Sequence, residues 1–306
     1  MHAWLAVAAL VFQTQDPTII TTRQLAIAPA ETLSVTTQGT GQPVVIIPGL
    51  LGAAYGFRHV TDGLARAGYG VVIVDPLGTG ASGRPDDDID WSLLTQADRI
   101  AAVLDSIGVR DALILVHALG APIGFRLAYR RPDLVSGVVS INGGPSERLD
   151  TPGVKSALRL APVLRLFGME GRARGKVRDG LLEASGDRTW VTDQIVEIYG
   201  APYRQDLWGT LEMLRDMSEA KELEPLYPNL PRIDAPIVLL VGGARSAKTM
   251  EPEDMTSLLT QVRDLRVDTI AGAGNYIHEE QPSAVIAAVR RMAAELAQSL
   301  AYRRRN

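Results

Sequence analysis

Residues Leu115–Ala121 read LVHALGA, and this stretch decides the predicted fold. The apolar run Ala112–Val116 leads into it and is typical of a buried strand. The segment Leu119–Arg131 that follows has apolar residues at helical spacing. Ala118 therefore stands on a sharp turn between a strand and a helix. The sequence predicts a strand–turn–helix unit of an α/β protein.

Similar apolar runs recur along the chain, with helical patterns between them. Continuous apolar runs, unlike alternating ones, are typical of strands that are covered on both faces of a parallel sheet. The expected strands are a weak one around Leu25–Thr37, then Val44–Pro48, Val71–Asp75, Ala112–Val116, Gly137–Asn142, Pro236–Gly242 and Arg266–Ala271. The expected helices are Phe57–Ala67, Trp91–Ile107 with Asp90 as N-cap, Leu119–Arg131, and Ser283–Ala301 opened by Pro282. This order predicts a doubly wound, mostly parallel α/β sheet.

The domain organisation follows from where this pattern stops. Residues 16–150 and 232–306 carry the strands and form the expected core, whereas residues 151–231 are helical in character and are expected to form a cap. Residues 1–15 contain a ten-residue apolar run, the length of a signal-peptide core and too short to span a bilayer. A signal peptide would export the protein to the periplasm or the extracellular space. The alternative is a cytoplasmic protein whose apolar N-terminus packs on the domain.

Composition excludes several classes of function. A formal charge of −4 and a pI near 5.7 argue against nucleic-acid binding. The chain has no cysteine, and its four histidines lack the spacing of a zinc site, so we expect no metal and no other cofactor. Gly78–Gly83 matches G-x-G-x-x-G, but an acidic loop follows instead of a helix, so no dinucleotide site is expected. No stretch predicts a transmembrane segment.

Four stretches occur in a recognisable order: VVIIPGLLGAAYGFRHV, GYGVVIVDPLGTGASGRP, ALILVHALGAPIGFRLAYRRPDLVSGVVSINGG and GAGNYIHEEQP. Together they resemble the α/β-hydrolase fold family, with a cap between the sixth and seventh strands, over about Val44 to Ala297. The resemblance places the nucleophile at Ala118 and the histidine base at Asn275. It places the acid at Asn142 or, after the next strand, near Arg245. All three triad positions are thus substituted.

The substitutions remove the chemistry of the triad. A methyl group cannot attack a carbonyl, and an amide cannot take up a proton near neutral pH. His278, three residues after Asn275, is expected to point elsewhere. The family's oxyanion hole would use the backbone N–H groups of Leu119 and Leu50, which do not depend on side-chain identity. His117, beside the hole, is expected to be structural.

Three interpretations remain open. The first is a catalytically silent protein that binds a small carbonyl or carboxylate ligand, or a protein partner that the sequence does not identify. The second is the inactivated form of a serine hydrolase that acted on an ester, amide or lactone through positions 118 and 275. The third is an enzyme with unorthodox chemistry that uses His117, His278 or a cap residue.

Overall fold

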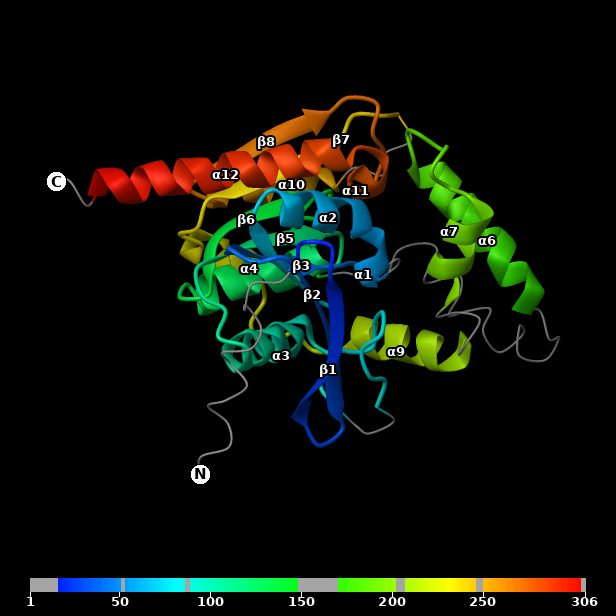
Figure 1. The fold of residues 1–306 in the computed structure, drawn as a ribbon. Coiled ribbons are helices and arrows are strands. Elements are labelled where there is room, and N and C mark those ends of the chain that lie inside the picture. Colours follow the sequence, from blue (N-terminus) through cyan, green and yellow to red (C-terminus); the bar gives the residue numbers. More distant parts are fainter. Residues whose placement is uncertain are drawn as a thin grey trace.

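The computed structural model describes residues 16–50, 53–85, 89–147, 170–201, 207–245 and 250–303. The predicted signal peptide, residues 1–15, lies outside these ranges. Eight strands form one sheet (Figure 1). Their bounds are β1 Ile20–Ala28, β2 Glu31–Gln38, β3 Gln42–Ile47, β4 Tyr69–Val74, β5 Ala112–His117, β6 Val135–Ile141, β7 Ile237–Gly242 and β8 Leu265–Ile270.

The sheet is mostly parallel, as predicted. Its strand order is β1-β2-β4-β3-β5-β6-β7-β8, and only the pairs β1–β2 and β2–β4 are antiparallel. In the centre, Ile47 of β3 is in register with Val116 of β5. The carboxyl ends of these two strands therefore lie side by side, and the loops that follow them can meet.

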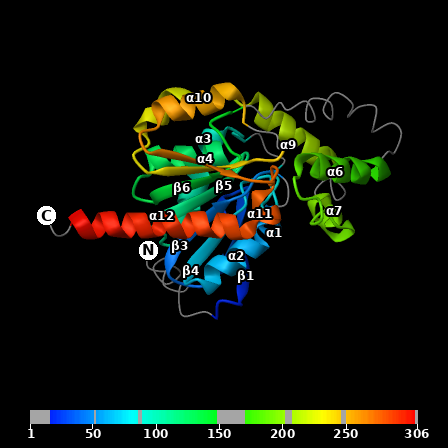
Figure 2. The ribbon, with the colours of Figure 1, turned by 90° about the horizontal axis from the view of Figure 1, so that it is seen from above.

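Helices cover both faces of the sheet, as Figure 2 shows from above. The bounds on one face are α1 Ala53–Gly56, α2 Arg58–Arg66, α11 Ile277–Glu280 and α12 Pro282–Arg303, and on the other α3 Leu93–Ser106, α4 Gly120–Arg130 and α10 Pro252–Gln261. Each layer packs on its own core cluster. In α2, for example, Val60 and Leu64 are four residues apart, so both side chains fall on the buried stripe of the helix. The doubly wound architecture is confirmed.

The segment between β6 and β7 is helical where the structure describes it. It contains α6 Glu170–Ala184, α7 Asp193–Tyr199, α9 Leu207–Glu219 and the 3₁₀ helix η2 Tyr227–Arg232. We call this segment the insertion. Figure 1 shows α6 and α7 beyond the end of the sheet towards which β7 and β8 run. The insertion thus stands at the carboxyl edge of the strands, where ligands bind in open α/β sheets.

Two expectations about local structure were wrong. The single weak strand expected around Leu25–Thr37 is a hairpin, because Ala28 pairs with Glu31 across a tight turn and splits the segment into β1 and β2. The N-cap of α3 is Ser92 and not Asp90. The Ser92 side chain accepts the N–H of Thr95, while the Asp90 carboxylate, two positions before the N-cap, accepts the N–H of Ser92 at 2.8 Å.

A buried cation joins the two ends of the insertion to the core. Arg126 on α4 is fully buried and forms ion pairs with Glu147 and with Glu222, the latter at 3.0 Å. Glu147 precedes α6 in the chain, and Glu222 follows α9. Glu222 also accepts the N–H groups of Leu93 and Leu94 at the start of α3. We call Arg126, Glu147 and Glu222 the neck cluster.

Candidate functional site

The turn between β5 and α4, residues 117–120, forms the predicted sharp elbow. Ala118 has a φ of +47°, a left-handed conformation that costs roughly 1–2 kcal/mol for a residue with a Cβ. A Cβ on Gly120 would lie 2.2 Å from the carbonyl oxygen of Ile47, so only glycine allows α4 to start this close to β3. The backbone has the strained geometry of a nucleophile elbow, but Ala118 offers no nucleophilic atom.

The loop after β3 lies against this elbow. A Cβ on Gly49 would lie 3.4 Å from Cβ of Ala118 and 3.2 Å from the carbonyl oxygen of His117. The next residue, Leu50, therefore comes beside the elbow. Within the described ranges, the backbone N–H groups of Leu50 and Leu119 donate to no oxygen. Two unused backbone donors at this place can bind a carbonyl or carboxylate oxygen.

The turn that carries Asn275 is held beside the elbow. The carbonyl oxygen of Asn275 lies 3.2 Å from Nε2 of His117, and its N–H donates to the carbonyl of Ala184 in the insertion at 2.7 Å. A Cβ on Gly274 would lie 2.3 Å from that same carbonyl oxygen, so the two backbones touch. The structure brings the elbow and the position of the base together, as the sequence predicted.

The two candidate positions for the acid, Asn142 and Arg245, differ in whether they contact the turn of Asn275. Asn142 directly follows β6 and has a φ of +45°. Its side-chain amide donates to the carbonyls of Gly274 (3.0 Å) and Asn275 (3.2 Å), and its Oδ1 accepts the N–H of Gly242 at 3.0 Å. Arg245, by contrast, is exposed on the loop after β7. Asn142 is therefore the acid position that contacts the turn of Asn275.

Two buried histidines lie behind the elbow. The rings of His117 and His278 are 4.5 Å apart between centroids, and His278 stacks on Phe57 at 4.4 Å. The sequence did not predict the apolar contact with Phe57, which holds the ring of His278 beside His117. Burial lowers the pKa of His117 to about 4 and that of His278 well below its usual value. Both rings are neutral at pH 7.

Two glutamates after Asn275 fasten its turn to the insertion. The Glu280 carboxylate accepts the N–H groups of Gly274 (2.9 Å), Tyr276 (3.2 Å), and Gly186 and Asp187 of the insertion (both 2.8 Å). Sequence reasoning missed this role. The only available signal was the acidic pair so close to a turn.

The side chain of Glu279 is fully buried and makes a second link. It pairs with Arg58 on α2 at 2.6 Å and accepts the hydroxyl of Tyr199 on α7 at 2.7 Å. Tyr199 also lies in an aromatic group with Trp190 and Tyr276. The insertion is thus packed on the turn by both polar and apolar contacts.

Comparison with known proteins identifies the fold. Residues 42–187 match the model of the family described as alpha/beta hydrolase fold. The solved epoxide hydrolase CorEH superposes with a TM-score of 0.72 over 91% of this chain and all of that one, at 18% identity. This chain has the α/β-hydrolase fold.

Curated relatives with the α/β-hydrolase fold differ in the reactions that they are named for. RutD of Klebsiella pneumoniae (strain 342), named for carbamate hydrolysis, is 32% identical over 163 residues, which are 53% of each chain. The chain thus spans about half the length of that relative. The cis-3-alkyl-4-alkyloxetan-2-one decarboxylase of Shewanella oneidensis is 24% identical over 270 residues, 84% of each chain.

The α/β-hydrolase fold also explains Asp75. Its carboxylate accepts the N–H groups of Ala54 and Ala81, both at 3.1 Å, and so fixes the loop after β4. A Cβ on Gly80 would lie 2.2 Å from this carboxylate, which shows how closely the loop wraps it. Burial raises the pKa of Asp75 to about 6.

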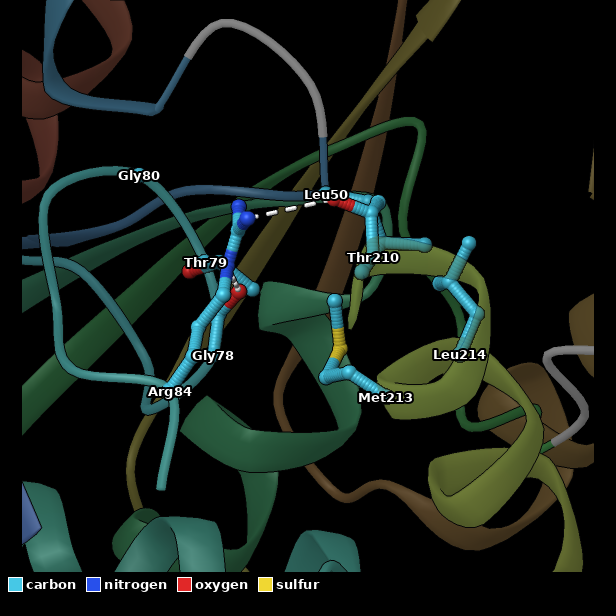
Figure 3. A pocket seen from close by; sticks show the side chains of 8 residues that line it. All are labelled: Leu50, Gly78, Thr79, Gly80, Arg84, Thr210, Met213 and Leu214. Carbon is cyan, nitrogen blue, oxygen red and sulfur yellow. Dashed lines mark hydrogen bonds between the residues drawn. The ribbon is translucent and has the colours of Figure 1, made fainter. Parts of the chain in front are cut away.

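The described side chains leave a small recess beside the elbow of this α/β-hydrolase fold, between the loop after β4 and α9 (Figure 3). Its cavity volume is about 10 Å³, the space of about one water molecule, and Ala118 does not line it. The lining residues are Leu50, Gly78, Thr79, Gly80, Arg84, Thr210, Met213 and Leu214.

Metal and membrane sites find no support in the described parts of the chain. Their His, Asp and Glu side chains form no cluster of three that could hold a metal ion. Their helices include none with both the length and the apolar character that a membrane span requires.

Proposed function

We propose that this protein is a catalytically silent member of the α/β-hydrolase fold that binds a small carbonyl or carboxylate ligand at the elbow. The observation that carries the proposal is the combination of Ala118 on an intact elbow with the unused N–H groups of Leu50 and Leu119. Backbone donors at such a turn bind a carbonyl or carboxylate oxygen whether or not a nucleophile is present.

The chemistry of the surrounding residues argues against acyl transfer. Ala118 supplies no nucleophile, and Asn275 supplies no base. His117 and His278 are buried, and their pKa values lie below the usual range, so that either ring binds a proton weakly. A general base at neutral pH works best with a pKa near 7. These residues favour binding over catalysis, and over the unorthodox enzyme that the sequence left open.

The second candidate is the inactivated form of a serine hydrolase for an ester, amide or lactone. The observation that favours it is the contact of Asn142 with the carbonyl of Asn275, because it keeps the acid and base positions adjacent. Two similar proteins are named for reactions of a carbamate and of an oxetan-2-one, which both contain a carbonyl group. In this reading the ligand is the former substrate.

Hydrolysis of p-nitrophenyl butyrate tests both candidates. The chain as it stands should give no turnover above background. Ala118→Ser/Asn275→His, with and without Asn142→Asp, should restore turnover if the site has lost only its reacting groups. Folded but silent revertants would exclude the second candidate. Turnover by the unchanged chain that His278→Ala abolishes would overturn both.

Calorimetric titration with methyl butyrate tests binding without chemistry. The chain should bind this ester, and Ala118→Met, which places a long side chain over the donors, should weaken binding at least tenfold. Ala118→Ser is the matched control and should bind like the parent. No heat of binding, or equal binding by Ala118→Met, would overturn the proposed function.

A further inference from the structure

Arg84 presents a cation in the recess beside Leu50. It stands on the loop after β4 and is half-buried. Its Nε–H donates to the carbonyl of Gly78 at 3.1 Å, and Nη1 donates to the hydroxyl oxygen of Thr210 on α9, also at 3.1 Å. Figure 3 shows the guanidinium held between these two groups, close to Leu50. Two anchors on different elements fix its orientation.

The guanidinium retains unused donors. Arginine has five N–H groups, and the two contacts of Arg84 occupy two of them. The other three find no acceptor within the described ranges. A planar guanidinium with free donors matches the two oxygens of a carboxylate.

The walls of the recess do not neutralise this charge. Its other lining residues are neutral. Asp75 lies below Gly80, but its oxygens accept the N–H groups of Ala54 and Ala81, and none of the described carboxylates pairs with Arg84. Residues 86–88, three aspartates, lie outside the described ranges. A partly desolvated cation against apolar side chains such as Met213 is stabilised by an incoming anion.

We propose that the half-buried guanidinium of Arg84, beside this recess, is an anion subsite that binds a carboxylate on the ligand whose carbonyl lies at the elbow. Leu50 connects the two places, since its side chain lines the recess and its N–H belongs to the oxyanion hole. The ligand is then a carboxylated carbonyl compound, such as the half-ester of a dicarboxylic acid. This inference rests on the proposed function.

Two matched esters test the subsite by calorimetric titration at low salt. Monomethyl succinate differs from methyl butyrate in carrying a carboxylate where the latter has a terminal methyl group. The chain should bind monomethyl succinate at least tenfold more tightly. Arg84→Gln should abolish this advantage and leave the affinity for methyl butyrate unchanged. Arg84→Lys, which keeps the charge but loses the planar fork, should keep part of the advantage.

Arg263→Gln is the control for loss of one positive charge. Arg263 is 77% exposed, pairs with Asp234, and precedes β8 at the opposite edge of the sheet. Arg263→Gln should change neither the affinity for monomethyl succinate nor the affinity for methyl butyrate. Circular dichroism checks folding, and the Lys variant provides the comparison if Arg84→Gln does not fold.

The outcomes separate the two proposals. Equal affinity of the parent for both esters, or an advantage that survives in Arg84→Gln, would overturn the subsite and leave binding at the elbow standing. Absence of binding by either ester would overturn the proposed function and the subsite with it.

Discussion

The side-chain amide of Asn142 donates to the main-chain carbonyl of Asn275 at 3.2 Å, and also to that of Gly274 at 3.0 Å. An amide suits this place because both neighbours are acceptors. The Asn142 amide is thus matched to the two carbonyl groups of the turn that carries Asn275. A carboxylate in the same orientation would face two carbonyl oxygens.

Asn142→Asp should therefore destabilise the chain at pH 7 by about 1–3 kcal/mol, the cost of two buried acceptors that lose their donor. The new carboxyl should have a raised pKa, so its protonation on acidification should recover part of the loss. Urea unfolding at pH 7 and pH 5 measures both effects. Asn142→Ser, which retains one donor, is the control, and equal stability of Asn142→Asp and the parent at pH 7 would contradict the argument.

His117 should make the fold sensitive to acid. Its pKa is about 4 in the folded state, whereas the ordinary pKa of histidine is 6.5, so the unfolded chain binds the proton more tightly. The contribution of His117 to the free energy of unfolding is fully present above pH 6.5. It is lost as the pH falls towards 4, by about 3 kcal/mol in total. His278 acts in the same direction.

The difference in unfolding free energy between the parent and His117→Gln isolates this effect, because the amide can still donate to Asn275. The parent should lose more stability between pH 6.5 and pH 4 than the variant. The comparison is needed because Asp75 acts with the opposite sign. Identical pH profiles for the two proteins would show that His117 titrates normally.

Asp75 should titrate with a midpoint near pH 6, because burial raises its pKa. The folded state binds this proton more tightly than the unfolded chain, so stability from this group rises as the pH falls from 6 to about 4. Carboxyl carbon NMR shifts measure the midpoint directly, with Asp75→Asn for assignment. A midpoint near 4 would mean that the hydrogen bonds from the N–H groups of Ala54 and Ala81 fully offset the effect of burial on the pKa.

Arg126→Met should cost about 3–5 kcal/mol, because it leaves Glu147 and Glu222 as unpaired carboxylates around a buried position. Arg130→Met is the matched control. Arg130 is 32% exposed and pairs with Asp98 and Glu224, so its loss should cost at most about 1 kcal/mol.

Urea unfolding compares the two arginine variants, and Arg126→Met/Glu147→Gln/Glu222→Gln should recover part of the loss. Equal effects of Arg126→Met and Arg130→Met would refute the special role of the neck cluster.

Glu280→Gln should loosen the contact between the insertion and the turn of Asn275. The carboxylate accepts four backbone N–H groups, two of them from Gly186 and Asp187. An amide offers one acceptor oxygen where the carboxylate has two. Hydrogen exchange of these four amides should accelerate, while exposed Glu295→Gln should leave them unchanged. Unchanged hydrogen exchange of the four amides in Glu280→Gln would show that the turn keeps its structure without the Glu280 carboxylate.

The sequence predicted what depends on local pattern. Continuous apolar runs located the parallel strands, and the change from a strand pattern to a helical pattern at Ala118 located the elbow. The contacts that the sequence did not predict have a different physical origin. The side chain of His278 is oriented by Phe57, more than two hundred residues earlier, and such a contact leaves no periodicity in the sequence. Arg126 looks like an ordinary helix-surface cation until Glu147 and Glu222 are brought to it by the fold.

Because of the neck cluster, the segment between Glu147 and Glu222 can be exchanged for another. Because the chain leaves the core at Glu147 and returns at Glu222, and both meet one side chain of α4, the two junctions are close in space. A segment of different length or sequence can span them without altering the strand order. Grafting another helical segment between these two glutamates would then replace most of the insertion and leave the elbow unchanged.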